Sequence, residues 1–207
     1  MDQDPPIRLA TVAVYPFRAD AEIALARLAA DAIAGVIRQD DEGGLNPGFF
    51  KRYGVRVEVA ADDVDDARDS LGVEHVDVPR PIFDAMFAHS GWCRPNEACG
   101  LIAFDGDRPA FAFCLTNTDE SQHRFTIDPA EHFGSIRLSE ALGFEIGAMF
   151  HSHLRSEAYP SDTDIAGGGD PDWIHFIVGP VYGSRPLLRG FRIVDGDVQE
   201  LSVGVEE

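Results

Sequence analysis

The feature that most constrains the fold is a pair of histidines at the end of an apolar run. The run Glu145–His151 has the composition of a buried strand, and His153 follows two residues later. On a strand, residues i and i+2 point to the same side, so both imidazoles can converge on one ion. Asp164 lies eleven residues beyond His153. Two histidines and one carboxylate leave the fourth position of zinc open for water, as in catalytic zinc sites.

The segment Ser161–Asp164 has a second interpretation, as the capping box at the start of a helix. The two interpretations are compatible, because a capped helix start would hold Ser161 and Asp164 rigidly near the histidines. In chains of this composition, the pattern His-x-His-x₇-Ser-x₂-Asp arises by chance in roughly one of a thousand. The spacing therefore indicates a site.

The charge of the chain excludes several classes of partner. Its 207 residues include 36 acidic and 17 basic side chains, a net charge of −19. Phosphate backbones would repel such a chain, and it has a single lysine, Lys51, so we expect no nucleic-acid partner. The most apolar stretch, Ile23–Ile37, contains charges and is too short to span a membrane. Residues 1–6 do not resemble a secretory signal, and three cysteines are too few for a disulfide framework, so we expect a cytoplasmic protein.

Two units are predicted, residues 7–78 and 79–207, with Pro79-Arg-Pro81 as a hinge between them. The first has a β-α-β-β-α order, which suggests a small ferredoxin-like sandwich. Its valines at 55, 57 and 59 alternate with polar residues, as in a half-buried strand. The expected elements are strands at Thr11–Tyr15, Val36–Ile37 and Val55–Val59 and helices at Asp20–Ile33 and Asp62–Leu71, with a break at Asp40–Gly44.

The second unit combines strands and helices. Asp195-Gly196 is a strong signal for a two-residue hairpin turn, and Pro129 is well placed in the first turn of a helix. We expect helices at Ile82–His89 and Pro129–Leu142 and strands at Ala98–Phe104, Pro109–Thr116, Arg124–Ile127, Glu145–His151, Trp173–Val178, Leu188–Val194 and Asp197–Val203.

The histidine motif with its serine and aspartate resembles the JAMM (MPN-plus) metalloprotease family. That family also has an upstream glutamate, and the segment Asn96–Leu101 resembles its glutamate segment, which makes Glu97 the match. Further resemblance covers Ile82–Glu207, at Asn117, Phe125–Pro129, Tyr159-Pro160 and Phe191–Gly196. The resemblance implies a mixed β-sheet flanked by helices, of the MPN/JAB type and cytidine-deaminase-like. The whole chain is then of the α/β (α+β) class.

The resemblance also implies a role for each site residue. His151, His153 and Asp164 would bind Zn²⁺, which activates a water molecule. Glu97 would be the general base that takes the proton of that water, and Ser161 would donate a hydrogen bond to the developing oxyanion.

Within the family, the segments around Glu97 and Glu157–Ser161 look most like the prokaryotic branch. The nearest resemblance is to peptidases that release cysteine from the C-terminal glycine of a ubiquitin-like sulfur-carrier protein. The implied partner is a carrier with a C-terminal Gly-Gly. Two alternatives remain: an isopeptidase that removes such carriers from lysines, and a non-catalytic MPN scaffold, which would not need all five site residues.

The N-terminal unit resembles a small bacterial domain described as signal-transducing, through its βαβ order and the Asn46-Pro-Gly48 loop with nearby aromatics. Its role stays open between a folding or dimerisation partner, which would make the protein a homodimer, and regulation or substrate docking. Cys93 and Cys99 lack ligand spacing and are expected to pack in the core. No role is assigned to five further histidines, His75, His89, His123, His132 and His175.

Overall fold

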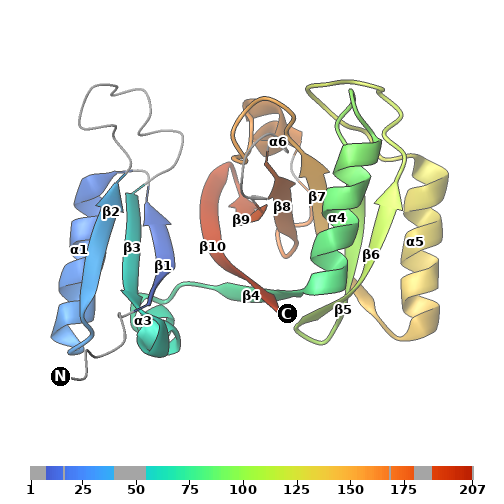
Figure 1. The fold of residues 1–207 in the computed structure, drawn as a ribbon. Coiled ribbons are helices and arrows are strands. Elements are labelled where there is room, and N and C mark those ends of the chain that lie inside the picture. Colours follow the sequence, from blue (N-terminus) through green and yellow to red (C-terminus); the bar gives the residue numbers. More distant parts are fainter. Residues whose placement is uncertain (1–7, 16, 40–54, 168, 180–187, 207) are drawn as a thin grey trace, which may run out of the picture. The chain divides into compact units, whose positions relative to one another are not determined.

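The computed structural model describes residues 8–15, 17–39, 55–167, 169–179 and 188–206, and these form two compact units divided between His75 and Val76 (Figure 1). The expected break at 40–44 and the loop with aromatics at 46–53 lie outside the described residues. Within the described ranges, none of the helices combines the length and the apolar composition that a bilayer crossing needs.

The first unit is a three-stranded antiparallel sheet with two helices packed on it. The sheet order is β1 (Leu9–Tyr15), β3 (Val55–Ala60), β2 (Gly35–Gln39). The helices are α1 (Arg18–Ala30) and α3 (Val64–Leu71), and the short 3₁₀ turn η2 (Ala61–Asp63) precedes α3. The three alternating valines of β3 are buried against both helices, as the sequence predicts.

The second unit is built on a seven-stranded mixed sheet. Its order is β4-β10-β9-β8-β7-β5-β6, in which β7 and β8 are parallel, while the β5/β6, β5/β7, β8/β9 and β9/β10 pairs are antiparallel. The strands are β4 (His75–Pro79), β5 (Cys99–Asp105), β6 (Arg108–Leu115), β7 (Glu145–Ser152), β8 (Ile174–Val178), β9 (Leu188–Val194) and β10 (Asp197–Glu206). The helices are α4 (Arg80–Trp92), α5 (Pro129–Leu142) and the short α6 (Asp162–Gly167).

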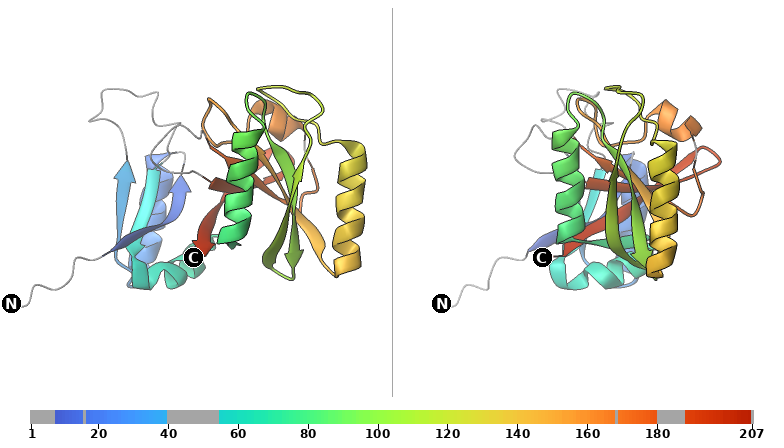
Figure 2. Two further views of the ribbon diagram at one scale, coloured as in Figure 1. Left: turned by 45° about the vertical axis from the view of Figure 1, so that its right-hand side comes forward. Right: turned by 90° about the vertical axis from the view of Figure 1, so that its right-hand side faces the viewer.

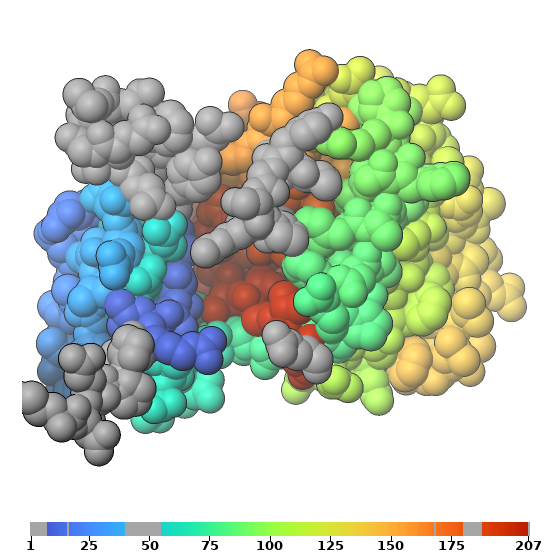
Figure 3. All heavy atoms as spheres, viewed as in Figure 1, coloured from blue at the N-terminus to red at the C-terminus, as the bar shows by residue number. Residues whose placement is uncertain are grey.

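Each face of this sheet is covered by one long helix, so the sheet is sandwiched between α4 and α5 (Figure 2). Beneath α4, Met86 packs with the buried side chains Ile102, Phe150 and Phe176. The space-filling view shows α4, in green, lying directly against the neighbouring residues of β6 (Figure 3). The α5 face holds a second cluster around Leu101 and Phe113. β8 pairs in parallel with β7 and is buried at all five positions, and four of its five residues are apolar, as expected for a strand covered on both faces; the fifth is His175.

The strand β4 lies at the edge of the second sheet, although the sequence pattern placed residues 76–78 in the first unit. Val76 and Val78 are buried in the α4 cluster of the second unit, which accounts for their place there. The following helix begins at Arg80 rather than Ile82, because a proline at position 81 is tolerated in a first helical turn.

The predicted strand at Arg124–Ile127 is wrong: the described structure has only an isolated bridge there, between Asn117 and Ile127. The side chain of Asn117 accepts a hydrogen bond from the Thr126 N–H at 3.1 Å and donates one to the Arg124 carbonyl at 3.1 Å. A side-chain amide therefore takes the place of a neighbouring strand for this segment.

The predicted helix at Pro129–Leu142 and the final hairpin are confirmed. Asp128 caps the helix by accepting hydrogen bonds from the N–H groups of Ala130 and Glu131 at 2.9 and 3.0 Å. Asp195 and Gly196 both have positive φ, at 53° and 86°, as a two-residue hairpin turn of this type requires.

Gly100 allows β5 to lie close to both of its neighbours. A Cβ at this position would overlap the carbonyl oxygen of Phe113 in β6 and the ring of Phe150 in β7. Because Phe150 is fully buried, its ring has no free space into which to move. The absence of a side chain at Gly100 thus allows the close packing of β5, the strand that begins two residues after Glu97.

We predict that Gly100→Ala lowers the free energy of unfolding by about 3 kcal/mol, the upper end for overpacking, because one obstacle is backbone. Gly134→Ala is the matched control: it lies in α5, where the added methyl group would meet open space, and should stabilise the helix by up to about 1 kcal/mol. Urea unfolding followed by circular dichroism measures both. Equal midpoints for Gly100→Ala and the wild type would contradict the packing argument.

The second unit should fold alone if β4 is kept. A fragment of residues 75–207 is expected to unfold cooperatively, whereas residues 80–207, without Val76 and Val78, should lose about 3–6 kcal/mol of stability from two buried side chains. Urea titration of both fragments measures the difference. If the shorter fragment is as stable as the longer one, β4 is not part of this unit.

Candidate metal centre

Two of the predicted site residues are held by the central strand β7. His151 lies opposite Cys99 of β5 and Ile177 of β8, so its backbone is paired on both sides. His153 follows the end of the strand, where its N–H donates to the Val178 carbonyl at 2.9 Å. Both rings are buried, and their Nε2 atoms are 3.1 Å apart. The period of two along the strand therefore brings the imidazoles together as the sequence suggests.

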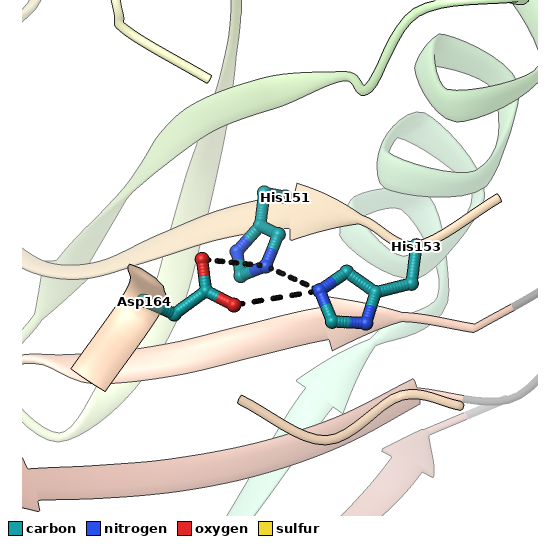
Figure 4. A group of neighbouring side chains, drawn as sticks. All are labelled: His151, His153 and Asp164. Atoms are coloured by element: carbon teal, nitrogen blue, oxygen red, sulfur yellow. Dashed lines mark hydrogen bonds and ion pairs between the residues drawn. The ribbon is translucent and has the colours of Figure 1, made fainter. Parts of the chain in front are cut away.

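Asp164 reaches the same point from the first turn of α6. Its Oδ1 is 3.5 Å from Nε2 of His151 and its Oδ2 is 3.5 Å from Nε2 of His153, so the three side chains point toward one another (Figure 4). Among the described residues, these three are the group whose donor atoms all lie within 4.8 Å.

Ser161 fixes the carboxylate of Asp164. The N–H and the hydroxyl of Ser161 both donate to Oδ2 of Asp164 at 2.7 Å, and the N–H of Asp164 donates back to the Ser161 Oγ at 3.2 Å. This reciprocal arrangement is the capping box that the sequence offered as one interpretation. The hydroxyl proton of Ser161 is thus directed to Asp164.

The hydrogen bond at Nδ1 of His153 determines which of its ring nitrogens is free. Nδ1 lies 2.6 Å from the carbonyl oxygen of Glu157, which can only accept, so Nδ1 carries the proton. The lone pair on Nε2 then faces His151 and Asp164, which is the usual arrangement of a metal-binding histidine. The ring of Phe125 stacks on His151, with centroids 4.7 Å apart and planes 24° from parallel.

The two acidic residues near the histidines have opposite pKa shifts. Burial raises the pKa of Glu97 to about 7, with His153 acting to lower it and Asp164 to raise it. Burial also acts to raise the pKa of Asp164, but the contacts with His151 and His153 and the Ser161 hydroxyl hold it far below its usual value. Asp164 is therefore anionic, while Glu97 sits near the pKa that suits proton transfer at neutral pH.

The imidazoles respond to the same surroundings. Burial lowers the pKa of His151 and keeps it neutral, with a lone pair available. Burial alone would also lower the pKa of His153, but Asp164, the Glu157 carbonyl and Glu97 together raise it. The raised pKa shows that the acidic groups favour a positive charge at this point, which a metal cation would supply.

Glu97 is placed beside this group by the pairing of β5 with β7. Cys99 is opposite His151, and the N–H of Ala98 donates to Ser152 Oγ at 2.9 Å while the Ser152 N–H donates to the Ala98 carbonyl at 3.0 Å. Glu97 lies one residue before this pairing, and its carboxyl group is close enough to His153 for each group to shift the pKa of the other. Glu97 is only 4% exposed and does not belong to the close three-residue group.

The three-residue group fits a zinc ion by its donor chemistry and its spacing. In a tetrahedral site with bonds of about 2.0–2.1 Å, neighbouring donor atoms lie about 3.4 Å apart. The measured separations are 3.1, 3.5 and 3.5 Å. Two neutral imidazoles and one anionic carboxylate would hold the metal and leave one position open.

Several residues around the site were not assigned a role from the sequence. The Glu157 carbonyl that orients His153 and the Phe125 ring on His151 belong to segments noted only for their family resemblance. His175, buried in β8, is electrostatically coupled to His151, and burial lowers its pKa. The contact of the Glu157 carbonyl and the stacking of Phe125 leave no spacing pattern in the sequence. Of these residues, only His175 could have been noted from the sequence, because it is a histidine within an apolar strand.

Comparison with known proteins points to one family. The profile described as prokaryotic homologs of the JAB domain matches residues 79–194. A Mycobacterium tuberculosis protein named CysO-cysteine peptidase is 36% identical over 128 residues, which cover 61% of this chain and 88% of that protein. A Haloferax volcanii protein named desampylase is 28% identical over 115 residues, covering 54% of this chain and 80% of that protein.

A solved structure agrees with the fold of the second unit. The solution structure of a Desulfitobacterium hafniense protein superposes with a TM-score of 0.59 and 29% sequence identity. The match covers 64% of this chain and 93% of that protein.

We predict that the wild-type protein, reconstituted at neutral pH, holds about one zinc per chain. His151→Ala, His153→Ala and Asp164→Ala should each lose it, because three ligands are the minimum for such a site. His123→Ala removes an exposed histidine outside the group and is the control that should keep zinc. Plasma mass spectrometry after gel filtration gives the stoichiometry. A wild type that retains no metal, or a control that loses it equally, would exclude this centre.

Proposed function

The chain belongs to the family of prokaryotic homologs of the JAB domain, and on that premise we propose that it is a zinc-dependent peptidase. It hydrolyses the bond after the C-terminal glycine of a ubiquitin-like sulfur-carrier adduct and releases cysteine. The observation that carries the proposal is the convergence of His151, His153 and Asp164 beside the buried Glu97. The relative named CysO-cysteine peptidase supports the choice of substrate.

The residues divide the chemistry between them. His151, His153 and Asp164 would hold zinc, which would supply an acidified water and a Lewis acid for the scissile carbonyl. Glu97 accepts the proton of the attacking water and returns it to the amine of the leaving cysteine, so that the carrier ends in a free glycine carboxylate. A pKa of about 7 suits both transfers, because the group must accept a proton and then donate it.

Ser161 is proposed as the donor to the oxyanion that develops on the glycine carbonyl. Its hydroxyl donates to Asp164 in the structure, so donation to substrate requires the hydroxyl proton to turn about the Cβ–Oγ bond. The Ser161 N–H would still hold Asp164 during that rotation. A hydrogen-bond donor to the oxyanion contributes about 3 kcal/mol to catalysis where it is preorganised, and the need to turn the hydroxyl lowers this figure for Ser161.

An isopeptidase acting on lysine-linked carriers is the second candidate. The relative named desampylase favours it. Both reactions attack the carbonyl of a terminal glycine, so the same side chains would serve, and only the leaving amine differs. Substrate selection, rather than the reacting groups, separates the two candidates.

A non-catalytic scaffold is less well supported by the burial of the site. Glu97, His151 and His153 are each at most 5% exposed. Burying an acid and two imidazoles costs folding free energy, which a surface for protein contacts alone would not need. We propose that the first unit serves in regulation or in substrate docking, since all of the site residues lie in the second unit.

We predict that Glu97→Gln keeps zinc near the wild-type level while turnover falls at least about a hundredfold, because the amide cannot accept the proton. Asp164→Asn should lose metal and activity together, because a neutral amide is a poor zinc ligand. The assay incubates enzyme with carrier–cysteine and carrier–lysine adducts and follows the carrier C-terminus by mass spectrometry, with and without chelator.

Glu140→Gln is the matched control, an exposed glutamate of α5 outside the group of site residues, and should behave as the wild type. The roles are wrong if Glu97→Gln keeps more than about a tenth of the activity, beyond what loss of a general base allows. They are also wrong if it loses its metal as Asp164→Asn does. Cleavage of neither adduct by zinc-loaded wild type would reject the proposed function.

A further inference from the structure

Asn117 is a buried side chain just beyond the end of β6 that forms four hydrogen bonds. Its Nδ2 donates to the Glu97 carbonyl at 3.0 Å and to the Arg124 carbonyl at 3.1 Å. Its Oδ1 accepts from the N–H of Asp119 at 3.0 Å and of Thr126 at 3.1 Å. Two donors and two acceptors exhaust the hydrogen-bonding capacity of an amide. A flipped amide would set its oxygen against two carbonyl oxygens, so the orientation is fixed.

One of these bonds acts on the backbone of the proposed general base. The Glu97 carbonyl accepts from Asn117, and the Glu97 N–H donates to the Ser121 carbonyl at 2.8 Å. Both polar backbone groups of Glu97 are therefore held by the segment 117–121. Pairing with β7 takes over only at the next residue, Ala98.

Two further hydrogen bonds of Asn117 hold the backbone on both sides of Phe125. The Arg124 carbonyl and the Thr126 N–H lie immediately before and after Phe125, whose ring stacks on His151. One amide thus fastens the segment that carries Glu97 to the segment that packs on a metal ligand. Glu97 and Phe125 are 28 residues apart in sequence, and no regular strand pairing joins their segments among the described residues.

We propose that Asn117 is a positioning residue that holds Glu97 at its working distance from the metal centre. This inference rests on the proposed function only in that Glu97 transfers the proton. Asn117 contacts neither metal ligand nor substrate and acts through the backbone of Glu97. A misplacement of a reacting group by about 1 Å costs about a hundredfold in rate, so a single backbone bond at this point matters.

The test compares Asn117→Ala and Asn117→Asp with the wild type in the full-length, zinc-loaded protein. The aspartate variant keeps the shape and the two acceptor contacts but cannot donate to the Glu97 carbonyl. Both variants should lower kcat about 10- to 100-fold, with KM within about threefold and zinc unchanged. Thr118→Ala, the control, removes a bond of the neighbouring residue to the Thr126 carbonyl and should leave kcat within about twofold.

A double-mutant cycle separates positioning from general damage. In the Glu97→Gln background, Asn117→Ala should cause no further loss of kcat, because the base it positions is already absent. An equal loss in both backgrounds would overturn the proposal. So would wild-type kcat in both Asn117→Ala and Asn117→Asp.

Hydrogen exchange gives a readout that does not depend on activity. In Asn117→Asp, the amide of Glu97 should exchange at least about tenfold faster, while the amide of Leu101 in the middle of β5 keeps its wild-type rate. Equal acceleration at both amides, or at neither, would overturn the proposal. If the wild type cleaves neither adduct, the proposed function fails, but the exchange rates still decide whether Asn117 holds Glu97.

Discussion

The antiparallel pairing of β5 with β7 is the constraint on which the candidate site depends. It sets Cys99 opposite His151, and Glu97, two residues before Cys99, then interacts electrostatically with His153. A shift of one residue in this register would turn Glu97 to the other face of the sheet. The pairing is pinned by Gly100, where the ring of Phe150 and the backbone of β6 leave no room for a side chain. Because Gly100 is only three residues from Glu97, its packing helps to fix the position of the proposed general base.

The site places two acidic side chains where little solvent reaches them. Glu97 and both imidazoles are buried and Asp164 is partly buried. The two acids differ in state: burial raises the pKa of Glu97 to about 7, whereas contacts with the histidines and Ser161 keep Asp164 ionised. Pairs of carboxyl groups whose surroundings move their pKa values apart can divide proton transfer and charge stabilisation between them. Here the anionic acid, Asp164, is one of the proposed metal ligands, and Glu97 lies beside the ligand group.

Elements formed by short-range patterns were predicted well. The helix start at Pro129, the turn at Asp195-Gly196 and the alternation of valines in β3 depend on neighbours within a few residues. The strand β4 was not predicted, because its two buried valines find their core in the second unit. The expected strand at Arg124–Ile127 is replaced by bonds to the side chain of Asn117, a partner that hydrophobic periodicity does not report.

The sequence by itself determined the three-residue group, because the period of a strand aligns His151 with His153 and the capping box at Ser161 orients Asp164 locally. Only the tertiary structure decided the place of Glu97, which is 54 residues from His151 and reaches it through the register of two strands. The same holds for Asn117 and Phe125, which act on the site through contacts between segments far apart in sequence. Such contacts depend on how separate segments pack, and packing between distant segments leaves no spacing in the chain.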